Sequence, residues 1–167
     1  MRLTSFGTKI LAVFAAVFLL AACETTPENK GATGGTGGAA QATQPGGPTK
    51  GSKEDFVINV GDRVFFDFDK YNIRSDARTT LEKQAAWLKQ YPQYTITVEG
   101  HCDERGTREY NLALGERRAN SVKNALVSLG IPTARIKTIS YGKERPVAAG
   151  HNEAAWAQNR RGVTVLN

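Results

Sequence analysis

The stretch from residue 24 to residue 53 contains no large apolar side chain, so it cannot contribute to a folded core. No Ile, Leu, Val, Phe, Tyr, Trp or Met occurs in it, and eight of the 21 residues from Gly31 to Gly51 are glycine. Such a sequence buries too little apolar surface to offset the loss of backbone entropy on folding. We therefore expect a disordered tether over residues 23–53 and one folded domain over residues 54–167.

The first 22 residues have the pattern of a secretory signal peptide. Arg2 and Lys9 give a basic start, and residues 10–22 contain no polar side chain. This apolar run is shorter than the roughly 20 residues that a membrane-spanning helix needs, and it fits the apolar region of a signal peptide. The run ends in Leu-Ala-Ala-Cys at residues 20–23, which resembles the lipobox of bacterial lipoproteins.

The lipobox resemblance implies a lipid anchor on Cys23. In bacterial lipoproteins the cysteine thiol carries a diacylglycerol, the chain is cut before the cysteine, and the new amine is acylated. Lipoproteins retained in the inner membrane typically have Asp at the next position, so Glu24 implies the outer membrane, with the folded domain facing the periplasm. Three acyl chains would hold the protein there almost permanently. The alternative is a plain signal peptide that ends in a cysteine by chance.

Composition excludes several classes of protein. Hydrophobic residues make up 40% and charged residues 23% of the 167 residues, and the formal net charge is +6. Both signs of charge are interspersed without a block of Lys or Arg, so the sequence gives little support to nucleic-acid binding. The two cysteines, Cys23 and Cys102, are too few for a disulfide-stapled miniprotein or a four-cysteine zinc site. We expect neither a metal nor a cofactor.

Residues 54–167 alternate between strand-like and helix-like patterns. Segments rich in β-branched and aromatic residues predict strands at 63–69, 94–99, 136–141 and 162–166. Apolar residues at helical spacing predict helices at 76–90, 107–129 and 153–158, the first with Ser75 as its candidate N-cap. The order βαβαβ(α)β predicts a two-layer α/β (α+β) sandwich, in which helices cover one face of a mixed four-stranded sheet.

One arginine falls on the apolar face of the long predicted helix. The apolar stripe of this helix consists of Tyr110, Leu114, Val122, Ala125, Leu126 and Leu129. Arg118 lies four residues from both Leu114 and Val122, and therefore in the same row. A buried guanidinium needs anionic partners, because an unpaired buried charge is very costly. Position alone leaves two interpretations open: an internal salt bridge to a carboxylate such as Asp103 or Asp69, or a ligand-binding site.

Several segments of residues 60–167 together resemble OmpA-like peptidoglycan-binding domains. Residues 98–107 contain the G-H-x-D-x-x-G turn of that family, and residues 111–126 match its helix pattern N-x-x-L-[SG]-x-x-R-A-x-x-V-x-x-x-L. Shorter segments are similar to its first strand, its third-strand exit and its last-strand entry: residues 64–71, 141–146 and 159–161. The combination is far more specific than any one motif, and it implies an OmpA-like fold.

The resemblance also implies a ligand and the residues that hold it. In OmpA-like domains the loop Asp and the helix Arg, here Asp103 and Arg118, bind the diaminopimelate residue of the peptidoglycan stem peptide. Diaminopimelate carries both carboxylate and ammonium groups. Asp103 can accept hydrogen bonds from the ammonium, and Arg118 can donate two to a carboxylate. A ligand of this kind would explain an arginine on an apolar stripe.

Six further residues are weaker candidates for the same site: Phe68, Asp69, Asn111, Leu114, Arg160 and Arg161. Phe68 and Asp69 end the first predicted strand, and Asn111 opens the long helix. Leu114 fits the core better than the site. The two arginines would either meet ligand carboxylates or neutralise acids nearby.

Cys102 departs from the family, which commonly has Ala or Thr at this position. If Cys23 is lipidated, Cys102 has no internal disulfide partner. In an oxidising periplasm the thiol is either buried and inert or open to an intermolecular disulfide. We favour a buried thiol, since the family keeps a small residue there.

Enzymatic and metal-binding interpretations have weaker support. His101, Cys102 and Asp103, with His151 as a second base, suggest a cysteine hydrolase, but sequence neighbours on a strand point in different directions. Asp103 and Glu104 as a glycosidase pair would have to flank a bond at about 5–9.5 Å. The histidines, the cysteine and Asp103 also lack a recognisable metal-ligand spacing. We expect a protein that is not an enzyme.

The parts of the sequence together predict a mechanical role. Lipid on Cys23 fixes the protein to the outer membrane, and the tether, with a mean span of roughly 30 Å, lets residues 54–167 reach the wall. The resemblance implies peptidoglycan as ligand and TolB and TolA of the Tol system as protein partners, with a part in envelope integrity and in constriction at cell division. The alternative is a general OmpA-like wall-anchoring lipoprotein outside the Tol system.

Overall fold

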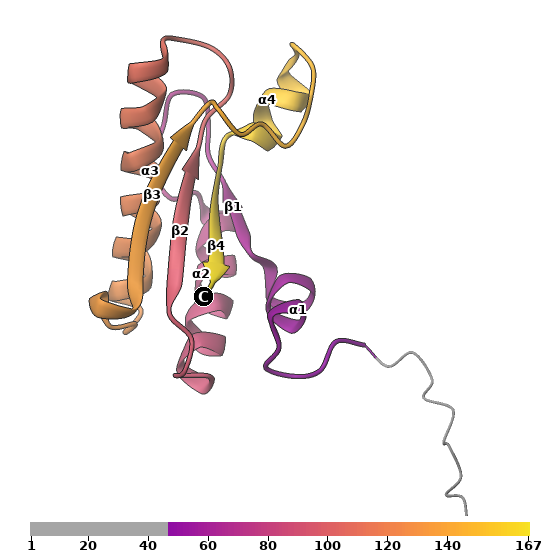
Figure 1. Cartoon of the computed structure of the whole chain (residues 1–167), viewed down its shortest axis with the longest axis vertical. Helices are drawn as coiled ribbons and strands as arrows, with labels where there is room; N and C mark the ends of the chain where they lie inside the picture. Colours follow the sequence, from indigo (N-terminus) through magenta and orange to yellow (C-terminus); the bar gives the residue numbers. More distant parts are fainter. Residues whose placement is uncertain (1–46) are drawn as a thin grey trace, which may run out of the picture. The chain divides into compact units, whose positions relative to one another are not determined.

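A mixed four-stranded sheet is the centre of the fold (Figure 1). The computed structural model describes residues 47–167, so the predicted signal peptide (1–22), the lipidation of Cys23 and most of the predicted tether lie outside the described residues. The strands are β1 (Arg63–Phe65), β2 (Ile96–His101), β3 (Ile136–Gly142) and β4 (Arg161–Leu166). Their order is β1-β4-β2-β3, with β2 and β3 parallel and the other two pairs antiparallel.

Two long helices, α2 (Ser75–Gln90) and α3 (Arg108–Ser128), pack beside each other on the sheet (Figure 1). The sequence predicted both to within two residues, and Thr107 caps α3 by accepting a hydrogen bond from the Tyr110 amide. The short helix α4 (Glu153–Asn159) lies at the end of the sheet from which β4 starts. The predicted two-layer sandwich with a mixed sheet is therefore confirmed.

Local details differ from the prediction, and β2 begins and ends two residues later than the strand predicted at 94–99. Ser75 is the first residue of α2 and not its cap; Arg74 holds the cap position without a side-chain hydrogen bond. The first strand ends at Phe65 and not at residue 69, because Lys70 bonds back to Asp67 in a turn and Asp69 has a φ of 55°. The sequence also gave no sign of the helical turns α1 (Lys53–Asp55), η1 (Phe56–Gly61) and η2 (Thr133–Arg135).

Contacts with the folded domain begin a few residues before its predicted start at 54. The Tyr94 hydroxyl donates to the Gly51 carbonyl at 2.9 Å, and the Gly51 amide donates to Asp55 at 2.9 Å. The Trp87 indole N–H on α2 also donates to Asp55, at 2.9 Å. Hydrogen bonds from Trp87, then Asn59 and Gly51, lower the pKa of the Asp55 carboxyl. This carboxylate therefore joins the start of the domain to α2.

The core lies between the sheet and the two long helices. Leu81 and Leu88 of α2 and Leu126 of α3 are almost completely buried there, against Ile96 and Val98 of β2. Within residues 47–167, no helix is long and apolar enough to cross a membrane. The apolar pattern of the sequence is thus used to bury one face of each helix on the sheet.

Two glycines allow α3 to approach β2 closely. A methyl group on Gly100 of β2 would lie only 1.8 Å from the carbonyl oxygen of Gly115 on α3. Arg118 follows Gly115 by one helical turn, and His101 follows Gly100 on the strand. The close approach therefore brings the Arg118 side chain to the end of β2.

This contact predicts that Gly100→Ala destabilises the fold. Overpacking a core typically costs about 1–3 kcal/mol, and here the obstacle is backbone that cannot rotate away. We expect a lower midpoint in thermal unfolding followed by circular dichroism. Gly47→Ala is the control, because a methyl group at Gly47 meets nothing within 4 Å. Equal midpoints for both variants would contradict the prediction.

Candidate functional site

A pocket of about 170 Å³ opens where three segments meet: the loop after β1, the loop after β2, and the first turns of α3. Its lining residues are Phe68, Asp69, Cys102, Asp103, Arg105, Gly106, Tyr110, Asn111, Leu114 and Arg118. The structure thus brings together six of the eight predicted ligand-binding residues. Arg160 and Arg161 are the two that do not line it.

Arg118 forms the inner wall of the pocket and is completely buried. Its guanidinium donates to three main-chain carbonyls: Nε to Lys70 at 2.8 Å, Nη1 to His101 at 2.8 Å and Nη2 to Asp67 at 3.1 Å. It therefore ties α3 to the loop after β1 and to the last residue of β2. The guanidinium also lies beside the Cys102 side chain, and its carbon is 5.2 Å from the centre of the Phe66 ring.

The positive charge of Arg118 has no carboxylate partner among residues 47–167. No carboxylate oxygen there lies within 4.0 Å of its guanidinium, so the salt bridge to Asp103 or Asp69 that the sequence left open is not formed. Burial lowers the pKa of Arg118, but a guanidinium remains protonated in proteins. A buried cation that holds only neutral carbonyls favours an anion beside it.

Asp103 is the buried acid of the pocket, and arginines surround it. Its Oδ1 accepts from the Arg105 amide at 3.2 Å and from Arg105 Nε at 3.3 Å. Its Oδ2 accepts from Arg105 Nη2 at 2.6 Å and from Arg160 Nη1 at 3.3 Å. Burial alone would raise the pKa of the Asp103 carboxyl, but the hydrogen bonds from Arg105 and Arg160 outweigh it and lower the pKa. Asp103 is therefore ionised.

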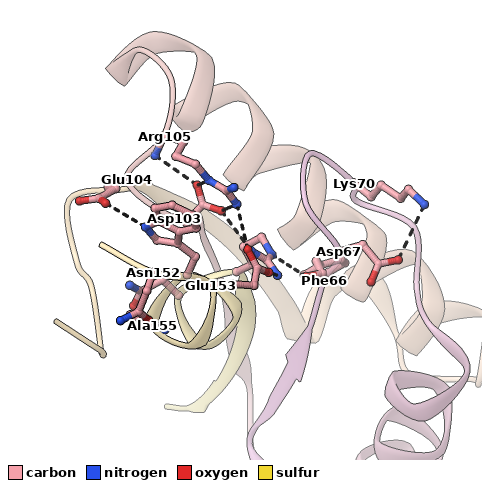
Figure 2. Close-up of polar contacts among 12 residues, drawn as sticks. Phe66, Asp67, Lys70, Asp103, Glu104, Arg105, Asn152, Glu153 and Ala155 are labelled. Atoms are coloured by element: carbon pink, nitrogen blue, oxygen red, sulfur yellow. Dashed lines mark hydrogen bonds and ion pairs between the residues drawn. The ribbon is translucent and has the colours of Figure 1, made fainter. Parts of the chain in front are cut away.

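Arg105 lies between two aromatic rings at the mouth of the pocket. Its guanidinium carbon is 4.0 Å from the centre of the Phe68 ring and 4.1 Å from that of Trp156. Figure 2 shows the Asp103 carboxylate beside the Arg105 guanidinium, with Glu153 of α4 also close to it. The sequence did not single out Arg105, because its two rings come from segments that are distant along the chain.

The rim of the pocket is polar and aromatic. The Tyr110 hydroxyl donates to Asp69, and both residues are exposed. The sequence placed Tyr110 in the apolar stripe of the helix; this was wrong, because its ring is 50% exposed one turn before the buried Leu114. Asn111 is buried and donates to the carbonyls of Arg105 at 2.8 Å and Thr107 at 3.0 Å, so it shapes the loop that carries Asp103.

Arg160 and Arg161 contact other parts of the chain. Arg160 donates to Asp103, to Glu153 at 2.6 Å and to the Phe66 carbonyl at 3.0 Å. Of the two roles considered for it, neutralising nearby acids is the one that these contacts support. Arg161 donates to the Arg145 carbonyl at 3.2 Å and to the Asn159 carbonyl at 3.4 Å.

Cys102 is buried, as expected. Its side chain contributes to the pocket wall, and its thiol donates to the Asn111 carbonyl at 3.3 Å. Burial raises the pKa of this thiol to about 11, so it stays protonated at neutral pH. A protonated, buried thiol is a poor nucleophile.

The two histidines considered for catalysis or metal binding, His101 and His151, each pair with a different acid. His101 lies 3.3 Å from Glu99, and burial lowers its pKa to about 4. His151 lies on the surface and pairs with Glu104 at 2.8 Å. The described part of the chain contains no group of three or more His, Cys, Asp or Glu side chains that could hold a metal ion.

Comparison with known proteins finds a family and several relatives of this chain. The family model described as "OmpA family" matches residues 65–160. Three proteins named peptidoglycan-associated lipoprotein are similar to this chain. That of Brucella melitensis is 59% identical over 141 residues (84% of this chain, 79% of that protein), that of Mesorhizobium japonicum 52% over 160 residues (95% and 91%), and that of Pseudomonas aeruginosa 40% over 165 residues (96% and 97%).

Solved structures show the same fold. The crystal structure of the peptidoglycan-associated lipoprotein from Burkholderia pseudomallei matches with a TM-score of 0.62 and 49% identity, over 64% of this chain and 90% of that one. The C-terminal domain of Helicobacter pylori MotB matches with a TM-score of 0.59 over 64% of this chain and 84% of that one. At 22% identity the second likeness concerns the fold alone.

The environment of Asp103 predicts a specific loss of stability in acid. Its folded-state pKa is lowered, so its contribution is complete above the unfolded-state pKa of about 3.9 and is lost as the pH falls through the folded-state pKa. We expect the unfolding temperature of the wild type to fall more than that of Asp103→Asn between about pH 5 and about pH 2. The other acids titrate in both proteins, so their effects on the unfolding temperature cancel in the comparison. An equal fall in both would contradict the prediction.

Proposed function

This chain belongs to the OmpA family, as one of its peptidoglycan-associated lipoproteins, and from this premise we propose that it fixes the outer membrane to peptidoglycan by non-covalent binding. Its relatives are lipoproteins of this name and not enzymes, in agreement with the prediction of a non-catalytic protein.

The unneutralised charge of Arg118 is the observation that carries the proposal. A guanidinium carries five N–H donors, and the three carbonyls of Lys70, His101 and Asp67 take three of them, so Arg118 can still donate to a ligand carboxylate. Asp103 lines the same pocket as an ionised acid. One cation and one anion in a single pocket suit a ligand that itself carries both charges.

Diaminopimelate in the peptidoglycan stem peptide is such a ligand. We assign its carboxylate to Arg118 and its side-chain ammonium to Asp103. Phe68 and Tyr110 at the mouth and Leu114 within the pocket would contact its aliphatic chain. A ligand carboxylate would also supply the anion that Arg118 otherwise lacks.

The lipid anchor on Cys23 belongs to the same proposal. Lipid on this residue would hold the protein in the outer membrane, with the folded domain in the periplasm. Eight of the 21 residues from Gly31 to Gly51 are glycine, and we propose that this part of the sequence serves as the tether between Cys23 and the domain. A weak pocket would suffice, because the anchor and the repetitive wall raise the effective ligand concentration.

A role in the Tol–Pal system extends the proposal to protein partners. TolB and TolA would link this anchor to the inner membrane, so that the outer membrane is drawn inward as the cell divides. The high identity to peptidoglycan-associated lipoproteins supports this assignment over a general wall anchor outside the Tol system. Retention of purified TolB by the immobilised lipoprotein would favour the Tol–Pal role, and failure to retain it would favour the alternative.

Pull-down with diaminopimelate-type peptidoglycan tests the pocket assignment. The full-length lipoprotein in detergent should sediment with peptidoglycan, and Asp103→Ala and Arg118→Ala should each lose at least about tenfold in affinity. Loss of a hydrogen bond to a charged group removes roughly 1.5–3 kcal/mol, and about 1.4 kcal/mol corresponds to tenfold.

Two exposed neighbours on α3 serve as matched controls for these variants. Arg117→Ala removes the adjacent guanidinium, and Glu109→Ala removes an acid from the first turn. Both should bind like the wild type. Circular dichroism checks that all variants are folded, since Arg118 also ties three segments together. Unchanged binding by folded Asp103→Ala and Arg118→Ala would place the wall-binding site elsewhere.

The anchor has its own test. Cys23→Ser removes the thiol that would carry the diacylglycerol, so metabolic labelling with palmitate should be lost and the protein should leave the membrane fraction. Cys102→Ser is the control, because that thiol is buried in the folded domain. Palmitate labelling that persists in Cys23→Ser would overturn the assignment of the lipid.

A further inference from the structure

The carboxylate of Asp103 has no vacant hydrogen-bonding position in this structure. An ionised carboxylate offers about four lone-pair sites. Two donors of Arg105 reach Oδ1, and a third donor of Arg105 together with Arg160 reaches Oδ2. A ligand ammonium can therefore bind Asp103 only if one of these donors leaves.

Arg105 is the donor that can leave. The Arg160 side chain is only 7% exposed, and it is also bonded to the Phe66 carbonyl and to Glu153. The Arg105 side chain is 31% exposed and lines the pocket itself. Its side chain can move toward solvent without disturbing the core.

Two aromatic rings hold Arg105 in the position that closes the site. Cation–π contact with Phe68 on one side and Trp156 on the other favours a guanidinium in the gap between them. The Trp156 indole N–H donates to Glu104 at 2.8 Å, which fixes the ring against the Asp103 loop. The rings come from the loop after β1 and from α4, so the closed position depends on both segments.

A second acceptor for Arg105 lies next to the first. Its Nη2 is 2.6 Å from Asp103 and 3.8 Å from Glu153, whose side chain is 64% exposed. Figure 2 shows the carboxylates of Asp103 and Glu153 beside the Arg105 guanidinium. When Arg105 leaves Asp103, its charge can stay paired with Glu153 at the surface, which lowers the cost of opening.

Arg118 and Asp103, the two charged residues of the pocket, thus differ in whether a group of opposite charge already pairs with them. Arg118 lacks an anionic partner, whereas the carboxylate of Asp103 is already saturated by cations. A ligand carboxylate at Arg118 breaks no ion pair of the protein. A ligand ammonium has to compete with Arg105.

We propose that Arg105 is a specificity-determining residue of this pocket, which occupies Asp103 in the empty site and is displaced by the ammonium group of a zwitterionic ligand. This inference rests on the proposed function, since it takes the stem peptide as the ligand. Arg105 selects for ligands with an ammonium group, because a ligand without one leaves the ion pair of Arg105 and Asp103 intact. It also keeps the affinity for the complete ligand low, so that the grip on the wall stays reversible.

The test compares two ligands in isothermal titration calorimetry with the full-length lipoprotein in detergent. One is a stem tripeptide that ends in diaminopimelate, and the other is the same tripeptide with its side-chain amine acetylated. Arg105→Ala should bind the free amine roughly fivefold tighter than the wild type, the scale of a partly exposed ion pair. Binding of the acetylated ligand should not change.

Two further variants separate charge from other effects. Arg105→Gln removes the charge and keeps most of the side chain, so it should act in the same direction. Arg108→Ala removes an exposed arginine that pairs with Glu144, and it should leave both affinities unchanged. A merely structural role of Arg105 would alter the binding of both ligands alike.

The outcomes distinguish failure of this inference from failure of the proposed function. If Arg105→Ala and Arg105→Gln bind the free amine no tighter than the wild type, while Asp103→Ala loses binding, Arg105 does not compete with the ligand and the inference is overturned. If Asp103→Ala binds like the wild type, the pocket assignment itself fails, and this inference with it.

Discussion

The buried guanidinium of Arg118 is the interaction on which the site depends. It donates to carbonyls of Asp67, Lys70 and His101, and so joins the loop after β1, the end of β2 and the middle of α3. Gly100 and Gly115 allow the close approach that this geometry needs. The side chain that joins three segments also lines the pocket, so in the proposed function one group serves both the fold and the ligand.

The charges around the pocket form two linked sets. On the inner side, Arg118 has neutral partners only and lacks an anion within the described part of the chain. On the outer side, Asp103 and Glu153 share Arg105 and Arg160 in a nearly balanced cluster. The carboxylate of a zwitterionic ligand would supply the anion that Arg118 lacks. Its ammonium would bind Asp103 in place of Arg105. The group that the ligand displaces then limits its affinity, which would keep the proposed wall binding reversible.

The sequence predicted the elements well where periodicity is strong, as in α2 and α3, and it placed Arg118 on the buried face from its row with Leu114 and Val122. It left the partners of Arg118 open, because carbonyls offered by distant loops leave no trace in residue types. Arg105 was missed for a related reason: its environment combines Phe68 and Trp156, which only the tertiary fold brings together. The turns before β1 were missed although Ser52 caps the first of them, because the contacts of Trp87 with Asp55 and of Tyr94 with Gly51 join residues that are distant along the chain.

A crystal structure of the lipoprotein with a stem tripeptide that ends in diaminopimelate tests the central claim most directly. The account predicts a ligand carboxylate at hydrogen-bond distance from Arg118, its ammonium on Asp103, and the Arg105 side chain turned toward Glu153. A tripeptide bound at another surface, or bound here without contact to Arg118, would contradict it.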